Sequence, residues 1–230
     1  MSAALVIAHR GAAAYEVENS LAAFRASAPL GADAVELDVH ATADGELIVH
    51  HDETLDGVHR ISHLVAAKTR SHRLANGEQV PTLAEALAAI APRLEVWVEL
   101  KSLGPQWDHK LLAALDAGPN PTGYAAHSFD HRIVRRLGEQ RPGLKRGVLS
   151  ASYLIRPVAA MEDAGATVLW QEHQVVDRAL VVTVHSAGGR VIAWTVDDAE
   201  RMRVLLEMGV DGICTNRPDV ARAVVGRRAA

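Results

Sequence analysis

Short apolar runs rich in β-branched residues alternate with Ala/Leu-rich segments of helical period along the whole chain of 230 residues. This alternation predicts strands separated by helices, the arrangement that builds a parallel sheet covered by helices. Nine runs are typical of strands, and they cover residues 4–8, 34–40, 46–51, 95–101, 123–129, 145–150, 167–172, 190–196 and 210–215.

One of these nine runs does not fit a closed parallel barrel of eight strands. Only five residues, 41–45, separate the run 34–40 from the run 46–51, and Asp44-Gly45 is a hairpin-turn dipeptide. A parallel crossover needs a dozen or more residues, so we expect the run 46–51 to be antiparallel to its neighbour. The other eight βα units predict a (β/α)8 TIM barrel, a single domain over residues 1–230 with an appended β-hairpin after strand 2. A doubly wound sheet is the alternative, but no glycine-rich phosphate loop follows the first run.

Side chains that accept hydrogen bonds from free backbone N–H groups mark the expected helix starts. The spacing of a capping box joins Thr82 to Glu85 and Asp197 to Glu200, and the expected single caps are Asn19, Asp130 and Asn216.

The composition excludes several classes of protein. With 49% hydrophobic and 23% charged residues, the chain is typical of globular proteins and not of disordered ones. Lys and Arg number 24 against 28 Asp and Glu, a net charge of −4, which argues against nucleic-acid binding. The one cysteine, Cys214, excludes an intramolecular disulfide. No run approaches the roughly 20 apolar residues that cross a bilayer, so we expect a cytoplasmic protein without integral membrane contact.

Acidic residues gather at the ends of two neighbouring barrel strands. Glu36 and Asp38 are two apart on one strand and point to the same side, and Glu99 lies on the next barrel strand. Three carboxylates inside a barrel need a cation between them, and oxygen ligands favour Mg²⁺ or Ca²⁺. We therefore expect one divalent ion at Glu36, Asp38 and Glu99. The alternative is a buried ion network in which the acids pair with Arg10 and Lys101.

Two histidines are expected to flank the acids. His9 ends the first strand, and a turn at 44–45 places His51 opposite Asp38, because cross-strand partners then sum to about 89. One imidazole can accept a proton while the other donates one near neutral pH. Arg10 and Lys101 add positive charge suited to a phosphate oxygen, so the whole set indicates phosphoryl transfer.

Three further side chains bear on the pocket or the core. His127 ends a barrel strand and is a candidate for the pocket. Trp97, which alternates with valines, is expected to pack between the barrel and its helices, whereas Trp170 fits either face of its strand.

An ordered set of motifs in this sequence resembles the glycerophosphodiester phosphodiesterase family. The motifs are His9-Arg10-Gly11, Glu18-Asn19-Ser20, Glu36-Leu37-Asp38-Val39, His51-Asp52-Glu53-Thr54-Leu55-Asp56, Glu99-Leu100-Lys101, Ser128-Phe129, Trp194-Thr195-Val196, Asp211-Gly212-Ile213 and Thr215-Asn216-Arg217-Pro218. The resemblance covers nearly the whole chain. Two departures are Asp197, where an asparagine often follows Trp-Thr-Val in the family, and a short segment 53–80, which leaves little room for an insertion domain.

The resemblance implies a barrel enzyme that hydrolyses small-molecule glycerophosphodiesters to glycerol 3-phosphate and an alcohol. By position, the three acids would hold the metal, and His9 and His51 would be the general acid and base. Arg10 and Lys101 would contact the phosphate, and Trp194 would line the pocket. Either a water molecule or the glycerol 2-hydroxyl could attack phosphorus, and the sequence does not decide between them.

Three other functions remain open from the sequence. A lysophospholipid-type phosphodiesterase, similar to a phospholipase D in its products, would use the same metal and histidines. A metal-dependent barrel amidohydrolase would need a His-x-His motif on the first strand, where this chain has His9-Arg10-Gly11. A non-catalytic phosphate-binding barrel would not need both His9 and His51.

Overall fold

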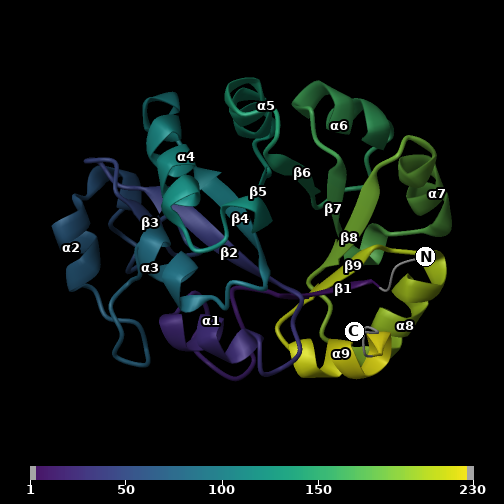
Figure 1. The fold of residues 1–230 in the computed structure, drawn as a ribbon, viewed down its shortest axis with the longest axis horizontal. Helices are drawn as coiled ribbons and strands as arrows, with labels where there is room; N and C mark the ends of the chain where they lie inside the picture. The colour runs from purple at the N-terminus through teal and green to yellow at the C-terminus, as the bar shows by residue number, and fades with distance from the viewer. Residues whose placement is uncertain (1–3, 227–230) are drawn as a thin grey trace.

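In the computed structural model, which describes residues 4–226, eight parallel strands close a barrel and helices surround it (Figure 1). Pairing of the first two strands closes the barrel. The barrel strands are β1 (Leu5–Ala8), β2 (Ala34–Ala41), β4 (Glu95–Ser102), β5 (Tyr124–Ser128), β6 (Lys145–Ser150), β7 (Val168–Glu172), β8 (Arg190–Trp194) and β9 (Gly212–Thr215). The expected (β/α)8 barrel is therefore confirmed.

The helices follow the strands in chain order. They are α1 (Leu21–Ser27), α2 (Ala66–Ser71), α3 (Leu83–Ala89), α4 (Asp108–Ala117), α5 (His131–Gln140), α6 (Pro157–Ala164), α7 (Arg178–Ser186), α8 (Ala199–Met208) and α9 (Pro218–Val225). Short 3₁₀ turns lie at Ile61–His63, Pro105–Trp107, Pro121–Gly123 and His173–Val175. No helix within residues 4–226 is both long and apolar enough to span a bilayer.

One further strand, β3 (Leu47–Val49), lies outside the barrel and pairs antiparallel with β2, as the short connection predicts. One edge of β2 bonds to β4, while its other edge bonds to β1 at residues 34–35 and to β3 at residues 39–41. The predicted register is wrong by one residue, because Val39 lies opposite Val49. Glu46 closes the ladder against Thr42 around a three-residue loop whose last residue, Gly45, has φ +77°. This loop is one residue longer than the expected turn, so His50 and not His51 comes opposite Asp38.

Apolar side chains form one core inside the barrel and others between the barrel and its helices. Trp97 and Trp170 lie in the interior core, with ring centroids 5.1 Å apart, so the expectation for Trp97 is wrong. The physical reason is strand periodicity: Trp97 is two residues before Glu99 and shares its inward face. Gly147 makes room for this pair, because a Cβ there would lie 2.8 Å from Trp170 Cδ1.

Two of the predicted helix caps are confirmed and three are wrong. Thr82 and Glu85 form the capping box of α3, and Asp130 caps α5. Ser20 caps α1 in place of Asn19, and Asp198 caps α8 in place of Asp197. Helix α9 starts with Pro218 and has no side-chain cap, so Asn216 does not cap it.

Candidate active site

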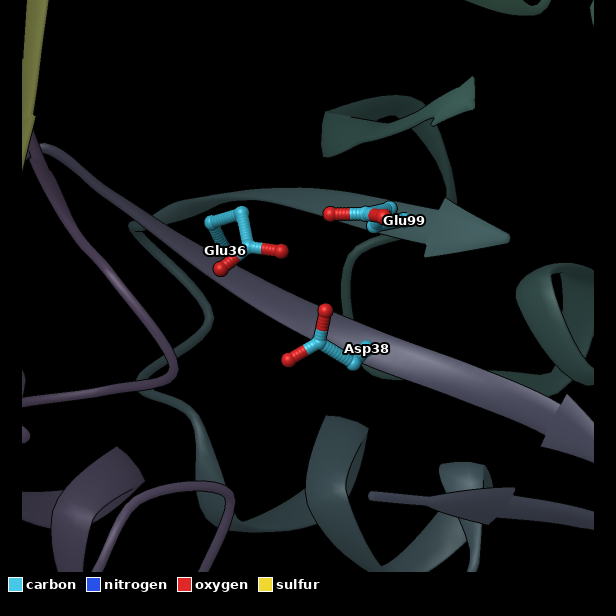
Figure 2. Close-up of side chains that lie close together, drawn as sticks. All are labelled: Glu36, Asp38 and Glu99. Atoms are coloured by element: carbon cyan, nitrogen blue, oxygen red, sulfur yellow. The ribbon is translucent and has the colours of Figure 1, made fainter. Parts of the chain in front are cut away.

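Three buried carboxylates meet inside the barrel, on two neighbouring strands. Glu36 and Asp38 point inward from β2, and Glu99 points toward them from β4, where it pairs with Asp38 (Figure 2). Their exposed fractions are 2%, 1% and 7%, and one oxygen of each lies within 4.8 Å of the others. The structure therefore brings together the three acids that the sequence predicts.

Two cations partly balance these carboxylates. Lys101 Nζ lies 3.1 Å from Asp38 Oδ1 and 2.7 Å from Glu99 Oε1, and Arg10 Nε lies 3.1 Å from Asp38 Oδ2. Three acids and two bases leave one negative charge when all are ionised. The ion network considered from the sequence thus exists, but it does not neutralise the cluster.

The remaining charge perturbs the carboxyl groups. Burial raises the pKa of Glu36 well above its ordinary value, and the charges of Asp38 and Glu99 raise it further. Burial also raises the pKa of Glu99 to about 7. Burial opposes ionisation of Asp38 too, but Lys101 and Arg10 outweigh it, and the pKa of Asp38 is lowered. Glu36 and Glu99 are therefore poised to lose protons when positive charge enters the cluster.

The donor atoms fit a hard divalent cation. Glu36 Oε1 accepts no hydrogen bond from any residue within 4–226, while its other oxygen accepts the Arg10 N–H at 3.1 Å. All the available donors are carboxylate oxygens, the ligands that Mg²⁺ and Ca²⁺ prefer. This cluster is also the one group of potential metal ligands found in the described part of the chain.

His9 directly follows β1, and the last residue of β9 and the loop after it hold His9 in place. Its Nδ1 lies 2.8 Å from Oδ1 of Asn216, and its backbone N–H donates to the Thr215 carbonyl. Burial and then the charge of Arg10 lower the pKa of His9 to about 4. The imidazole is therefore neutral at pH 7 and able to accept a proton.

Arg10 adopts a left-handed backbone conformation, with φ at 53°. For a residue other than glycine this conformation costs about 1–2 kcal/mol, and it turns the chain sharply after β1. The turn aims the Arg10 N–H at Glu36 and its guanidinium at Asp38 and at Glu18, whose Oε2 lies 2.8 Å away. The surrounding contacts therefore hold a strained residue at the pocket.

His51 follows β3 and lies beyond the last residue of that strand that pairs with β2, and it lines the pocket. Its Nδ1 lies 2.7 Å from Asp52 Oδ1, and this hydrogen bond lowers the pKa of Asp52. Buried His40 bridges the region, with Nδ1 2.9 Å from Ser102 Oγ and Nε2 3.2 Å from the His51 carbonyl. Although the predicted pairing with Asp38 is wrong, His51 and His9 both line one cavity.

The cavity has a volume of about 270 Å³ and lies at the C-terminal mouth of the barrel. Eight of the nine residues singled out from the sequence line it beside further apolar side chains, and these eight are His9, Arg10, Glu36, His51, Glu99, Lys101, His127 and Trp194. The Trp194 ring lies edge-on to Phe129, with the ring centroids 5.5 Å apart. Asp38 lies behind this lining, in ion pairs with Arg10 and Lys101.

His127 forms part of the cavity floor. It is 1% exposed, packs against Trp170 at 4.2 Å, and its Nε2 lies 3.9 Å from Glu36 Oε1. Burial lowers the pKa of His127 to about 3, so the ring is neutral. Neither ring nitrogen has a hydrogen-bond partner among residues 4–226.

For two site residues, Asn19 and Asn216, the only role that the sequence predicts is a helix cap. Asn19 donates from Nδ2 to Asp38 Oδ2 at 2.8 Å and accepts the Asp38 N–H, and Asn216 holds His9. The signal that could have identified them is their position directly after polar motif residues, Glu18 and Thr215. An asparagine side chain can cap a helix or form a bridge to a neighbouring strand. The residue type alone therefore does not distinguish these two roles.

The model of the glycerophosphoryl diester phosphodiesterase family matches residues 9–220. A glycerophosphodiester phosphodiesterase of Caldanaerobacter subterraneus subsp. tengcongensis is 34% identical over 231 residues, covering 94% of this chain and 95% of that protein.

Two solved structures are similar along their whole length. A glycerophosphodiester phosphodiesterase of Parabacteroides distasonis has a TM-score of 0.88 at 25% identity, covering 97% of each chain. A phosphodiesterase of Oleispira antarctica, in complex with the product sn-glycerol-3-phosphate, has a TM-score of 0.88 at 23% identity and covers 97% of each chain. The second likeness concerns the fold alone.

Proposed function

The chain belongs to the glycerophosphoryl diester phosphodiesterase family, and on that premise we propose that it hydrolyses glycerophosphodiesters to glycerol 3-phosphate and an alcohol. It is a phosphoric diester hydrolase, and the proposal assigns this activity to a single domain of residues 1–230. The observation that carries it is one cavity lined by two histidines, two cations and buried carboxylates. Such a set matches the charge that develops on a phosphodiester during displacement.

Glu36, Asp38 and Glu99 would hold one divalent cation, Mg²⁺ or Ca²⁺. A cation there supplies positive charge to a phosphate oxygen when bound. Arg10 and Lys101 place their charged groups beside the same carboxylates and would bind the other phosphate oxygens. Trp194 and His127 would line the space that the rest of the substrate fills.

The geometry supports distinct roles for the two histidines. His9 is neutral and would accept the proton of the attacking O–H group, which belongs either to water or to the glycerol 2-hydroxyl. His51 has the Asp52 carboxylate as its counter-charge and would give a proton to the leaving alkoxide oxygen. One O–P bond then forms as the other breaks, and the two proton transfers balance. When the glycerol 2-hydroxyl attacks, the product of this step is a cyclic phosphate, and water must open it in a second step, with the two histidine roles reversed, to give glycerol 3-phosphate.

The direct test uses chelator-stripped protein with several glycerophosphodiesters and a lysophospholipid, each with Mg²⁺, Ca²⁺ or Mn²⁺. Release of glycerol 3-phosphate that depends on added metal is expected. Turnover of the lysophospholipid alone would replace the proposed substrate class. The absence of turnover in every combination would contradict the proposal and favour a non-catalytic phosphate-binding barrel.

Removing either imidazole separates the two roles. His9→Ala and His51→Ala should each lower kcat by about 10²- to 10⁴-fold on a diester with a choline leaving group. A p-nitrophenyl leaving group needs no proton, so this substrate should restore the rate of His51→Ala but not of His9→Ala. Exposed His109 on α4 provides the control, His109→Ala. Wild-type turnover by either site variant would refute the acid–base proposal.

A further inference from the structure

Asp197, in the loop after β8, lies directly behind the residue that holds His9. Its Oδ1 accepts hydrogen bonds from the Asn216 backbone N–H and from Thr215 Oγ1, each at 2.8 Å. Its Oδ2 accepts from Asn216 Nδ2 at 2.7 Å. A carboxylate that receives three donors is held firmly, and it can only accept.

This carboxylate fixes which way the Asn216 amide faces. The two ends of an amide look alike in shape, so the hydrogen-bond partners decide the orientation. Because Asp197 must receive the NH₂ group, the carbonyl oxygen of Asn216 faces His9 Nδ1, 2.8 Å away. His9 must then carry its proton on Nδ1, which leaves the lone pair on Nε2.

We propose that Asp197 is a positioning residue that acts through Asn216 to hold His9 in the Nδ1–H tautomer. The catalytic consequence rests on the proposed function, since only that tautomer offers Nε2 as a proton acceptor. The hydrogen bonds from Asp197 through Asn216 to His9 join the loop after β8, the loop after β9 and the residue that follows β1. Backbone hydrogen bonds also join the loop after β8 to β9, through the Val196 N–H and the Cys214 carbonyl, and the loop after β1 to the loop after β9, through the Ala14 N–H and the Asn216 carbonyl. Asp197 is also one of the positions at which this chain departs from the family pattern, because an asparagine often stands there.

The geometry predicts what Asp197→Asn does. The Asn216 backbone N–H cannot turn round, so the new amide must present its oxygen there and its NH₂ to the Asn216 side chain. Asn216 then turns its own oxygen away from His9 and presents NH₂ to Nδ1. His9 is left with its proton on Nε2, the wrong nitrogen for accepting one.

The reciprocal exchange tests the same logic. In Asp197→Asn with Asn216→Asp, the new amide donates to the new carboxylate, whose second oxygen accepts from His9 Nδ1. The hydrogen-bond series and the Nδ1–H tautomer are restored with the same atoms and the same net charge. A role in folding alone does not predict this rescue in kcat.

The first measurement is the tautomer itself, which does not depend on substrate. Two-bond ¹H–¹⁵N correlation spectra at pH 7, with His9 signals identified by their absence in His9→Gln, should show Nδ1–H in the wild type. Asp197→Asn should show Nε2–H, and the double variant Nδ1–H again. An Nε2–H tautomer in the wild type would overturn the proposal whether or not the protein is active.

The second measurement is kinetic. Asp197→Asn should lower kcat by about 10- to 100-fold with KM nearly unchanged, because Arg10 and Lys101 are untouched. The double variant should regain kcat to within about fivefold of the wild type. The matched control is Asp198→Asn, the same change one residue on, at the α8 cap, which should leave kcat unchanged.

Failure of this inference is distinguishable from failure of the proposed function. If Asp197→Asn keeps both the tautomer and kcat, or if the double variant folds with the wild-type Tm but gains nothing, Asp197 is no positioning residue. If the tautomers respond as stated and no glycerophosphodiester is turned over, the positioning stands and the proposed function does not.

Discussion

Replacing Glu99 by glutamine should make the metal-free protein more stable while it removes activity. The substitution keeps the size of the side chain but removes one of three clustered negative charges. Burial raises the pKa of Glu99 from its ordinary value of 4.5 to about 7 in the folded protein. A carboxyl group with a raised pKa contributes stability below pH 4.5, and that contribution is lost as pH rises through 7.

The size of the effect follows from the two pKa values. The rise of the Glu99 pKa from 4.5 to about 7 corresponds to about 3 kcal/mol against folding at pH 8, and to about 1 kcal/mol at pH 5. Glutamine has no such penalty, so Glu99→Gln should gain up to about 3 kcal/mol at pH 8 and less at pH 5. For a chain of this length that corresponds to a Tm rise of roughly 5–10 °C.

The assay is thermal unfolding in chelator at pH 5 and pH 8, with Mg²⁺ added in a second series. Wild-type Tm should rise with Mg²⁺, and the Tm of Glu99→Gln should respond far less because a ligand is lost. Glu207→Gln, the same change on the exposed face of α8, controls for net charge. A metal-free Glu99→Gln that is no more stable than the wild type at pH 8 would refute the argument that the cluster is held under repulsion.

Two further predictions concern the same site. The cation must displace protons from Glu99 and Glu36, so calorimetric titration should show Mg²⁺ binding that weakens between pH 8 and pH 6, with log Kd changing by about one to two per pH unit. A pH-independent Kd would contradict this. His40→Phe leaves Ser102 Oγ and the His51 carbonyl without their partner, so urea unfolding should show a loss of about 1–3 kcal/mol, together with a lower kcat. A variant as stable as the wild type would show that the bridge contributes nothing.

The strand-level prediction from the sequence holds because its signals are local. The ends of all nine strands lie within two residues of the predicted ranges, and the short loop at 41–45 correctly separates β3 from the barrel. The exact register does not follow, because the difference between a two-residue and a three-residue loop depends on how Gly45 and Glu46 bond to Thr42.

The residues of the candidate site also include some that the sequence places correctly and some that it does not. Side chains two residues apart on a strand share a face, so the sequence alone places Glu36 with Asp38, and Glu99 with Lys101, inside the barrel. The same rule places Trp97, two residues before Glu99, on the inward face of β4. The alternation with valines alone does not show which face is inward, so the expectation drawn from it was wrong.

Sequence by itself thus determined the barrel, its appended hairpin, and which acids and bases reach its mouth, since periodicity and turn residues act within a few positions along the chain. Only the tertiary structure decided what Asn19, Asn216 and Asp197 bind. A short polar side chain after a strand can cap the next helix or reach sideways to another strand. That choice depends on the neighbour that the closed barrel brings within about 3 Å, from up to 207 positions away in the chain.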